Sequence, residues 1–296
     1  MLVAIASGKG GTGKTTVSAS LASVWSEVWN RPVAAVDLDV EEPNLHLFLR
    51  PCITRARTAN LEIPEIDTAL CTRCGACREL CQFGAVTILG DTPMVFADMC
   101  HACGGCRAVC PVGAVSAGQR EIGRVEEGTF GDNVFLRGLL RVGEAMSPPL
   151  IRDVMTRLAA MLAEQPELAR ADAILDAPPG TSCPAGAAVA QADCIVLVTE
   201  PTPFGVHDFR LAVEAFTTLG KPMAVVVNRA GSGDDTLYAA CRDLGLSILA
   251  EFPDDRAVAE TYARGGLLAD VGPQWRQACL DLAKAVGKLG GEGRHA

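Results

Sequence analysis

The feature that most constrains this chain is a glycine-rich segment near its start, residues 8–16, with the sequence GKGGTGKTT. The apolar run Leu2–Ala6 precedes it, and residues 16–29 after it carry apolar side chains at helical spacing. The segment is therefore predicted to join a buried strand to a helix. In that setting, glycines let backbone N–H groups turn inward on a phosphate, and the helix directs its positive end at the same point.

The segment matches the phosphate-loop pattern Gly-x-x-x-x-Gly-Lys-Thr in full. This pattern places Lys14 at the β- and γ-phosphates and the Thr15 hydroxyl at Mg²⁺. A chance glycine turn is the alternative, but it does not account for strand, loop, Lys-Thr pair and helix occurring together. We therefore predict ATP or ADP with Mg²⁺ as cofactors, held by Gly8, Lys9, Gly10, Gly11, Thr12, Gly13, Lys14, Thr15 and Thr16.

Two further apolar runs end in carboxylates. Residues 32–36 lead into Asp37 and Asp39, and residues 173–175 lead into Asp176. Because the carboxyl ends of parallel strands line the ligand crevice, Asp37 and Asp39 are expected beside the phosphates. For the first pair, the alternative is that the two carboxylates cap the turn that follows.

The rest of the chain alternates between strand and helix patterns, which predicts a mostly parallel sheet covered by helices. Short strands and turns are expected between residues 119 and 143. A helix is expected from Ser147, as its cap, to about residue 163, and a last helix from 275 to 289 with one apolar face. Later strands are expected at residues 194–199, 224–228 and 246–249.

Composition limits where the protein can act. A length of 296 residues suggests about two domains, and 49% hydrophobic residues suffice for a core. No apolar run approaches the roughly 20 residues that cross a membrane, and the first run lacks a basic leader. We expect a cytoplasmic protein with no stable membrane insertion. The formal net charge of -9 argues against general nucleic-acid binding.

Cysteines form an internal repeat in the middle of the chain. Cys-x-x-Cys-x-x-Cys-x-x-x-Cys occurs twice, and the second copy follows the first by 29 residues (100 − 71 and 110 − 81). Thiols stay reduced in the cytosol, so a disulfide framework is not expected. The first copy consists of Cys71, Cys74, Cys77 and Cys81, and the second of Cys100, Cys103, Cys106 and Cys110.

This spacing resembles that of bacterial ferredoxins with two 4Fe-4S clusters, in which the fourth cysteine of each repeat binds the other cluster. The resemblance implies one cluster on Cys71, Cys74, Cys77 and Cys110, and a second on Cys100, Cys103, Cys106 and Cys81. One departure is Gln82, where the pattern has proline. Zinc is the competing metal, although its modules usually carry two separated cysteine pairs.

The remaining cysteines and His101 lack ligand spacing. We expect His101 at the surface, with a hydrogen bond to a cluster sulfur as the alternative. The other cysteines are predicted to be small buried hydrophobes, with Cys183 a minor candidate for redox or partner chemistry. They are Cys52, Cys183, Cys194, Cys241 and Cys279.

The second lysine inside the phosphate loop, Lys9, resembles the deviant Walker A motif of the MinD/ParA class of ATPases. That resemblance implies a homodimer in which Lys9 reaches the nucleotide of the other subunit. It also implies that Asp39 orients or activates the attacking water and that Asp176 lies near Mg²⁺ through water. The Gly180 N–H would sense the γ-phosphate, and the base contacts would come from Asn228, Pro253 and Asp254.

Together the two resemblances suggest a MinD-superfamily ATPase with an inserted ferredoxin domain. Residues 1–60 and 120–296 would form the α/β P-loop core, and residues 61–119 a small α+β insert. Lys9, Lys14 and Asp39 are the predicted catalytic residues. The implied function is a dimeric switch that couples ATP hydrolysis to electron transfer with a redox or metallocofactor protein. The alternatives are an iron-sulfur cluster carrier, and a positioning or partitioning ATPase whose clusters are structural.

Overall fold

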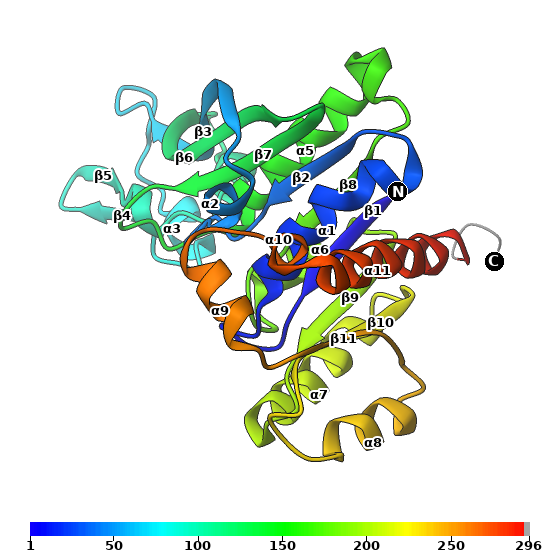
Figure 1. Ribbon diagram of the computed structural model, residues 1–296. Helices are drawn as coiled ribbons and strands as arrows, with labels where there is room; N and C mark the ends of the chain where they lie inside the picture. The colour runs from blue at the N-terminus through cyan, green and yellow to red at the C-terminus, as the bar shows by residue number, and fades with distance from the viewer. Residues whose placement is uncertain (293–296) are drawn as a thin grey trace.

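A computed structural model describes residues 1–292 and shows a nine-stranded sheet with helices on both faces (Figure 1). The strand order is β11-β10-β9-β1-β8-β2-β7-β6-β3. All neighbours from β11 to β7 pair in parallel, whereas β6 and β3 add an antiparallel edge. The prediction of an α/β fold with a mostly parallel sheet is confirmed.

The strands of the large sheet are β1 (Leu2–Ala6), β2 (Val33–Asp37), β3 (Cys52–Ile66), β6 (Val115–Phe130), β7 (Asn133–Leu140), β8 (Asp172–Asp176), β9 (Cys194–Thr199), β10 (Met223–Ala230) and β11 (Ser247–Pro253). A separate hairpin consists of β4 (Val86–Leu89) and β5 (Thr92–Val95). Every residue of β2, β8 and β9 is buried. Such continuous apolar strands are typical of a parallel sheet covered on both faces.

The helices are α1 (Lys14–Trp29), α2 (Leu45–Leu49), α3 (Ala76–Leu80), α4 (Gly105–Ala108), α5 (Pro148–Glu164), α6 (Cys183–Val189), α7 (Pro203–Thr217), α8 (Thr236–Asp243), α9 (Arg256–Ala263), α10 (Leu268–Val271) and α11 (Pro273–Glu292), with 3₁₀ turns η1 (Ala97–Met99) and η2 (Pro166–Leu168). These helices pack into two apolar cores, one on each face of the sheet. Helices α5 to α8 cover one face of the sheet, and α1, α2, α10 and α11 cover the other. No helix among residues 1–292 is long and apolar enough to cross a bilayer.

The last helix packs as its apolar face predicts. Cys279, Leu282, Ala283 and Val286 of α11 are buried in the core that α11 shares with α1. The predicted helix after Ser147 is also present as α5, and Ser147 stands at its N-cap position. Its side chain forms no capping hydrogen bond, so Ser147 occupies the N-cap position without capping the helix.

The segment before α5 differs from the prediction. Instead of short strands between residues 119 and 143, two long strands, β6 and β7, run antiparallel, and β3 pairs with β6 from Cys52↔Thr129 to Ile66↔Val115. Only residues 123–130 of β6 pair with β7, so its other half extends past the sheet together with β3. The predicted boundaries near residues 60 and 120 therefore fall inside continuous strands.

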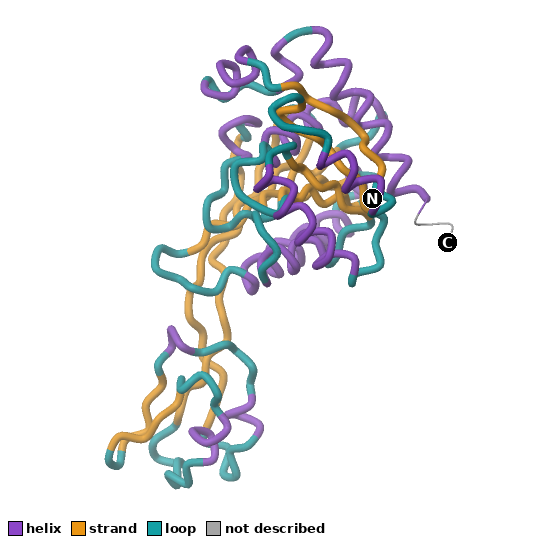
Figure 2. Tube along the Cα trace, turned by 90° about the horizontal axis from the view of Figure 1, so that it is seen from below, coloured by secondary structure: helices purple, strands orange, loops and turns teal. Residues whose placement is uncertain are grey.

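The extended strands carry a small lobe away from the sheet (Figure 2). This cysteine lobe comprises residues 67–114 and contains α3, α4, η1 and the β4–β5 hairpin. Its two ends meet, because the Asp67 N–H donates to the Ala114 carbonyl oxygen at 2.8 Å. All eight cysteines of the repeat lie in this lobe.

Candidate functional site

The phosphate loop lies between β1 and α1, as predicted, and is packed tightly at both ends. A Cβ atom on Gly8 would lie 2.1 Å from the Asp208 carbonyl oxygen. Gly13 has a φ of 88°, and a Cβ there would lie 2.1 Å from Asn228 Nδ2. Gly10 and Gly11, by contrast, have open space beside them among the described residues. The loop is therefore held at its ends and open in its middle, which is the form of a phosphate cradle.

The loop opens on a cavity of ≈ 430 Å³, which is large enough for a small-molecule ligand. Most of the predicted nucleotide-binding residues reach this cavity, and so do residues from five other segments. Beside the loop, its walls are formed by Asp39, Glu42, Asn44, Pro179, Asn228, Arg229, Pro253, Asp254, Asp255, Val258, Ala259, Tyr262 and Leu268. The fold thus brings Asn228, Pro253 and Asp254 to the phosphate loop from distant parts of the chain.

A buried carboxylate organises the inner end of the loop. Asp176 has no exposed side-chain surface and accepts hydrogen bonds from Lys14 Nζ at 2.8 Å and Thr15 Oγ1 at 2.7 Å. The Ser18 hydroxyl, one turn further along α1, donates to the same carboxylate at 2.8 Å. Buried charges require such partners. Lys14, Thr15 and Asp176 are thus assembled at one point, and Thr15 and Asp176 are the oxygen donors that could hold Mg²⁺ together with phosphate.

The two aspartates after β2 have different environments. Asp37 is fully buried and accepts the N–H groups of Asp39 at 3.2 Å and Leu45 at 2.9 Å, so capping is the right interpretation for this residue. Burial and the charge of Asp176 raise its pKa well above the usual value. Asp39 is half-buried and faces the cavity. Burial, opposed by Lys14 and reinforced by Asp176, raises the pKa of Asp39 to about 6.

The second loop lysine is bound within its own chain. Lys9 Nζ lies 2.5 Å from Glu200 Oε1, and Arg229 Nη1 lies 2.7 Å from the other oxygen of the same carboxylate. Glu200 and Ser18 are the contributors that sequence reasoning missed. Ser18 could have been found as a polar residue four positions after Lys14, on the buried face of the helix.

Two groups predicted to contact the nucleotide already form hydrogen bonds within the protein. The Gly180 N–H donates to the Ser7 carbonyl oxygen at 2.9 Å, and it is therefore not directed at a phosphate in this state. Asn228 Nδ2 donates to the Thr12 carbonyl oxygen at 2.8 Å. Asn228 thus supports the phosphate loop, and its amide oxygen is the group left for a base.

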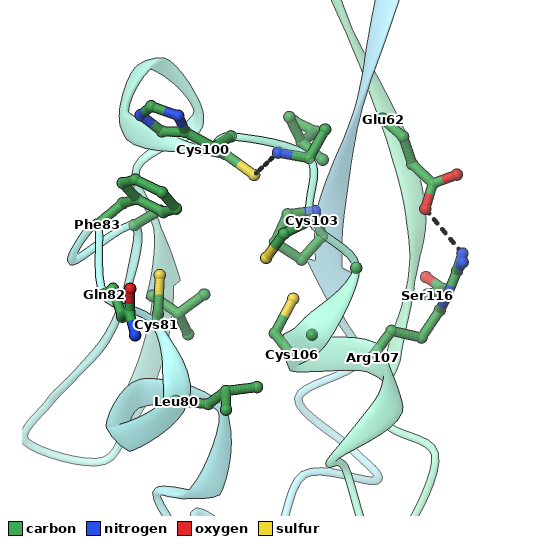
Figure 3. Close-up of a pocket in the computed structure, with 18 residues that line it drawn as sticks. Glu62, Leu80, Cys81, Gln82, Phe83, Cys100, Cys103, Cys106, Arg107 and Ser116 are labelled. Atoms are coloured by element: carbon green, nitrogen blue, oxygen red, sulfur yellow. Dashed lines mark hydrogen bonds and ion pairs between the residues drawn. The ribbon is translucent and has the colours of Figure 1, made fainter. Parts of the chain in front are cut away.

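The cysteines of the lobe gather in two groups. Cys81, Cys100, Cys103 and Cys106 line a cavity of ≈ 370 Å³ (Figure 3). Cys71, Cys74, Cys77 and Cys110 line a second hollow of ≈ 20 Å³. In each group, three cysteines come from one repeat and the fourth comes from the other.

The loops around these cysteines have the same backbone shape in both repeats. Arg73 and Ala102 have positive φ values of 58° and 55° and occupy equivalent positions, as do Gly75 and Gly104 at 85° and 70°. Left-handed residues of this kind turn backbone N–H groups inward, which suits a negatively charged cluster. Two such bonds to sulfur are present, from Ala102 N to Cys100 Sγ at 3.4 Å and from Ala114 N to Cys110 Sγ at 3.2 Å.

No group of three or more His, Cys, Asp or Glu side chains among residues 1–292 converges on a point where one metal ion could be held.

The other cysteines and His101 are placed as follows. Cys194, Cys241 and Cys279 are buried, as predicted, but Cys52 and Cys183 are exposed, so the prediction was wrong for these two. Cys52 begins the edge strand β3, and Cys183 begins a short helix at the surface. His101 is exposed and stacks on Phe83, with ring centroids 3.6 Å apart.

Comparison with solved structures supports the fold. The cell division ATPase MinD of Pyrococcus furiosus has a TM-score of 0.59 and 20% identity, with 97% of this chain and 98% of that chain covered. The ParA family ATPase of Chlorobium tepidum has a TM-score of 0.57 and 15% identity, with 96% and 97% covered. MinD complexed with Mg-ADP from Pyrococcus horikoshii has a TM-score of 0.57 and 20% identity, with 99% and 98% covered.

Sequence comparisons are more specific. Two uncharacterized proteins of Methanocaldococcus jannaschii are 30% and 33% identical to this chain; the first match covers 90% of both chains and the second 95% of both. The family model of the CobQ/CobB/MinD/ParA nucleotide binding domain matches residues 3–268 of this chain. The chain therefore belongs to the CobQ/CobB/MinD/ParA family of nucleotide binding domains.

Proposed function

We propose that this protein hydrolyses ATP and acts as a switch that closes into a homodimer across its nucleotides. The observation that carries the proposal is one cavity lined by Lys9, Lys14, Thr15 and Asp39, with the buried Asp176 in contact with Lys14 and Thr15. Phosphoryl transfer depends mainly on positioning and charge neutralisation, and these side chains supply both.

The residues have separate tasks in this mechanism. Lys14 and the open N–H groups of the phosphate loop bind the β- and γ-phosphates. Bound through Thr15 and Asp176, Mg²⁺ would neutralise phosphate charge. Asp39 accepts a hydrogen bond from the attacking water, whose oxygen forms the new bond to the γ-phosphorus as the bond to the ADP oxygen breaks. Lys9 of each subunit stabilises the charge on the nucleotide of the other.

Light scattering after size-exclusion chromatography tests the switch. With Mg-ATP the chain should elute as a dimer and with ADP as a monomer, and the Lys9→Ala variant should stay monomeric while still binding nucleotide. Lys284→Ala, which removes a half-exposed lysine on α11, is the matched control. A wild-type chain that neither binds ATP nor changes mass with it would refute the proposal.

Two cellular roles are candidates for what the switch controls. A positioning or partitioning role has the better support from the comparisons, because the solved structures with this fold include MinD cell division ATPases and a ParA family ATPase. A redox role rests on the cysteine lobe. We propose that its two groups of four cysteines hold two 4Fe-4S clusters and that these exchange electrons with a protein partner. No relative described above is named for electron transfer.

A chain of contacts connects the nucleotide cavity to the cysteine lobe. The Leu140 N–H donates at 2.9 Å to the carbonyl oxygen of Val40, the residue after Asp39. The next residue, Arg141, contacts Asp98 at 3.2 Å, and Asp98 lies in η1, two positions before Cys100. Movement of the segment after Asp39 can therefore be transmitted to the group formed by Cys81, Cys100, Cys103 and Cys106.

Electron paramagnetic resonance of reduced, anaerobically purified protein, with and without Mg-ATP, separates these outputs. Two cluster signals that shift with ATP would support nucleotide-controlled electron transfer. Two signals indifferent to ATP, combined with ATP-dependent localisation, would support positioning with structural clusters. A cluster carrier would transfer labile iron to an apoprotein. Zinc in place of iron and sulfide would exclude the redox proposal.

A further inference from the structure

Glu200, a carboxylate outside every motif of the sequence, binds the extra lysine of the phosphate loop. It follows β9, and only 7% of its side chain is exposed. One oxygen accepts from Lys9 Nζ at 2.5 Å and from the Thr202 hydroxyl at 3.1 Å, and the other pairs with Arg229 at 2.7 Å. The ammonium group of Lys9 is therefore held inside its own protomer.

The carboxylate is fixed in place by the first turn of α7. A Cβ atom on Gly205 would lie 2.3 Å from the Glu200 carbonyl oxygen and 2.8 Å from its Cγ, so only glycine allows this packing. Thr202, which contacts the carboxylate, also caps α7 by accepting the Gly205 N–H at 3.1 Å. Because Glu200 is clamped here, it cannot follow Lys9 if the lysine moves outward. Movement of Lys9 must break the ion pair.

The carboxylate is charged at neutral pH. Burial raises the pKa of Glu200, but the hydrogen bonds and charges of Lys9, Thr202 and Arg229 outweigh it and leave the pKa below its usual value. Arg229 has a positive φ of 51° and lines the nucleotide cavity, so Glu200 also joins the phosphate loop to the base side of the site.

We propose that Glu200 is a positioning residue that retains Lys9 in the free protomer and so sets how easily two subunits close over their nucleotides. This rests on the proposed dimeric switch, in which Lys9 reaches the nucleotide of the other subunit. One ammonium group cannot occupy both places, so closure competes with the Lys9–Glu200 pair. Arg229 remains beside Glu200 as a counter-charge when Lys9 leaves.

The first test uses the free protein without nucleotide. An amine-reactive ester followed by mass spectrometry reports the accessibility of each lysine, and Lys284 serves as an internal reference because its side chain is 53% exposed. Lys9 should react more slowly than Lys284 in the wild type and markedly faster in Glu200→Gln. Arg229→Gln, which keeps the Lys9 pair, should leave Lys9 slow. Equal Lys9 reactivity in the wild type and Glu200→Gln would overturn the proposal.

The second test measures the dimer dissociation constant in Mg-ATP by analytical ultracentrifugation. Closure releases two partly exposed ion pairs, one in each subunit, so Glu200→Gln should dimerise roughly 2- to 30-fold more tightly. Glu200→Asp, which keeps the charge, should stay close to the wild type and covers the case in which Glu200→Gln does not fold. A folded Glu200→Gln that dimerises no more tightly than the wild type contradicts the proposal. A wild type that never dimerises refutes the dimeric switch instead, while lysine labelling still decides whether Glu200 retains Lys9.

Discussion

The two aspartates after β2 differ in what their oxygens are free to do. Both oxygens of Asp37 accept backbone N–H groups, whereas Asp39 turns toward the nucleotide cavity. The charged groups around Asp39 are Lys14 from α1, Asp176 at the end of β8 and Glu41 beside it. Asp39 is therefore the carboxylate that can meet a water molecule.

Replacing Asp39 by Asn should leave ATP binding intact and lower the hydrolysis rate by about 10²- to 10⁴-fold, the usual contribution of a positioned proton acceptor. In the wild type, the rate should fall as pH drops through about 6, because Asp39 becomes protonated there. Phosphate release and nucleotide binding, measured separately from pH 5 to 8, check both points. Asp132→Asn, on the exposed turn between β6 and β7, is the control. A rate unaffected by Asp39→Asn would exclude the catalytic role.

The same substitution should raise thermal stability at pH 7.5. Asp39 titrates near 6 in the folded chain and near 3.8 when unfolded, so between these values the folded state binds more protons. Stability contributed by this group therefore falls as pH rises through that window and stays low above it. Asn carries no buried charge, so Asp39→Asn should unfold at a higher temperature than the wild type at pH 7.5. The gain should disappear near pH 4.

Two glycines of the phosphate loop should respond differently to alanine. Gly13 has a φ of 88° and no room for a Cβ, so Gly13→Ala should lower the free energy of unfolding by about 1–3 kcal/mol. Gly10→Ala should unfold like the wild type, because its Cβ would enter open space. Thermal unfolding without nucleotide measures both. Similar losses at the two positions would mean that the loop is not held as described.

The sequence singled out Lys14, Thr15 and Asp176, and the structure brings these three side chains into contact. The sequence did not single out the residues that contact and position them. Glu200 was not predictable, because it belongs to no motif and meets Lys9 only through tertiary packing. Local sequence patterns do not record contacts between residues 191 positions apart.

At the level of elements, the fourth cysteine of each repeat lies with the first three cysteines of the other repeat. Cys110→Ser should remove the cluster shared with Cys71, Cys74 and Cys77, and Cys81→Ser should remove the other one. Each variant should keep about half of the iron and sulfide, with a different remaining resonance signal. Cys183→Ser, which changes an exposed cysteine outside the lobe, is the control. Identical signals from the two variants would contradict the exchange.

The strands β3 and β6 were the elements least visible in the sequence. Five of the first six residues of β3 are exposed, and the segment mixes Arg and Thr. Its sequence would therefore suit a solvated loop as well as a strand. It also contains Pro64, which a strand tolerates only at an edge. In the structure β3 is the edge strand, so its pairing with β6 was decided by the sheet and not by local propensity.

For the whole molecule, the division between core and cysteine lobe can be tested by excision. Because Ile66 and Val115 form the last pair of the β3–β6 ladder, an Asn-Gly turn replacing residues 67–114 should close the two strands as a hairpin. The shortened chain should still bind ATP. At a hundredfold excess of ATP over its dissociation constant, binding should stabilise it by about 2.7 kcal/mol, measurable as a rise in melting temperature. Loss of nucleotide binding would show that the lobe is part of the ATPase fold.

The extension of β6 past β7 also has a mechanical consequence. The half of β6 that pairs with β3 but not with β7, residues 115–122, spans about 26 Å at the usual rise of a strand. A stiff arm of that length turns each degree of tilt at its base into about 0.5 Å of travel at its far end. Rearrangements too small to be noticed beside the nucleotide would therefore become shifts comparable to an atomic radius or more where the thiols lie.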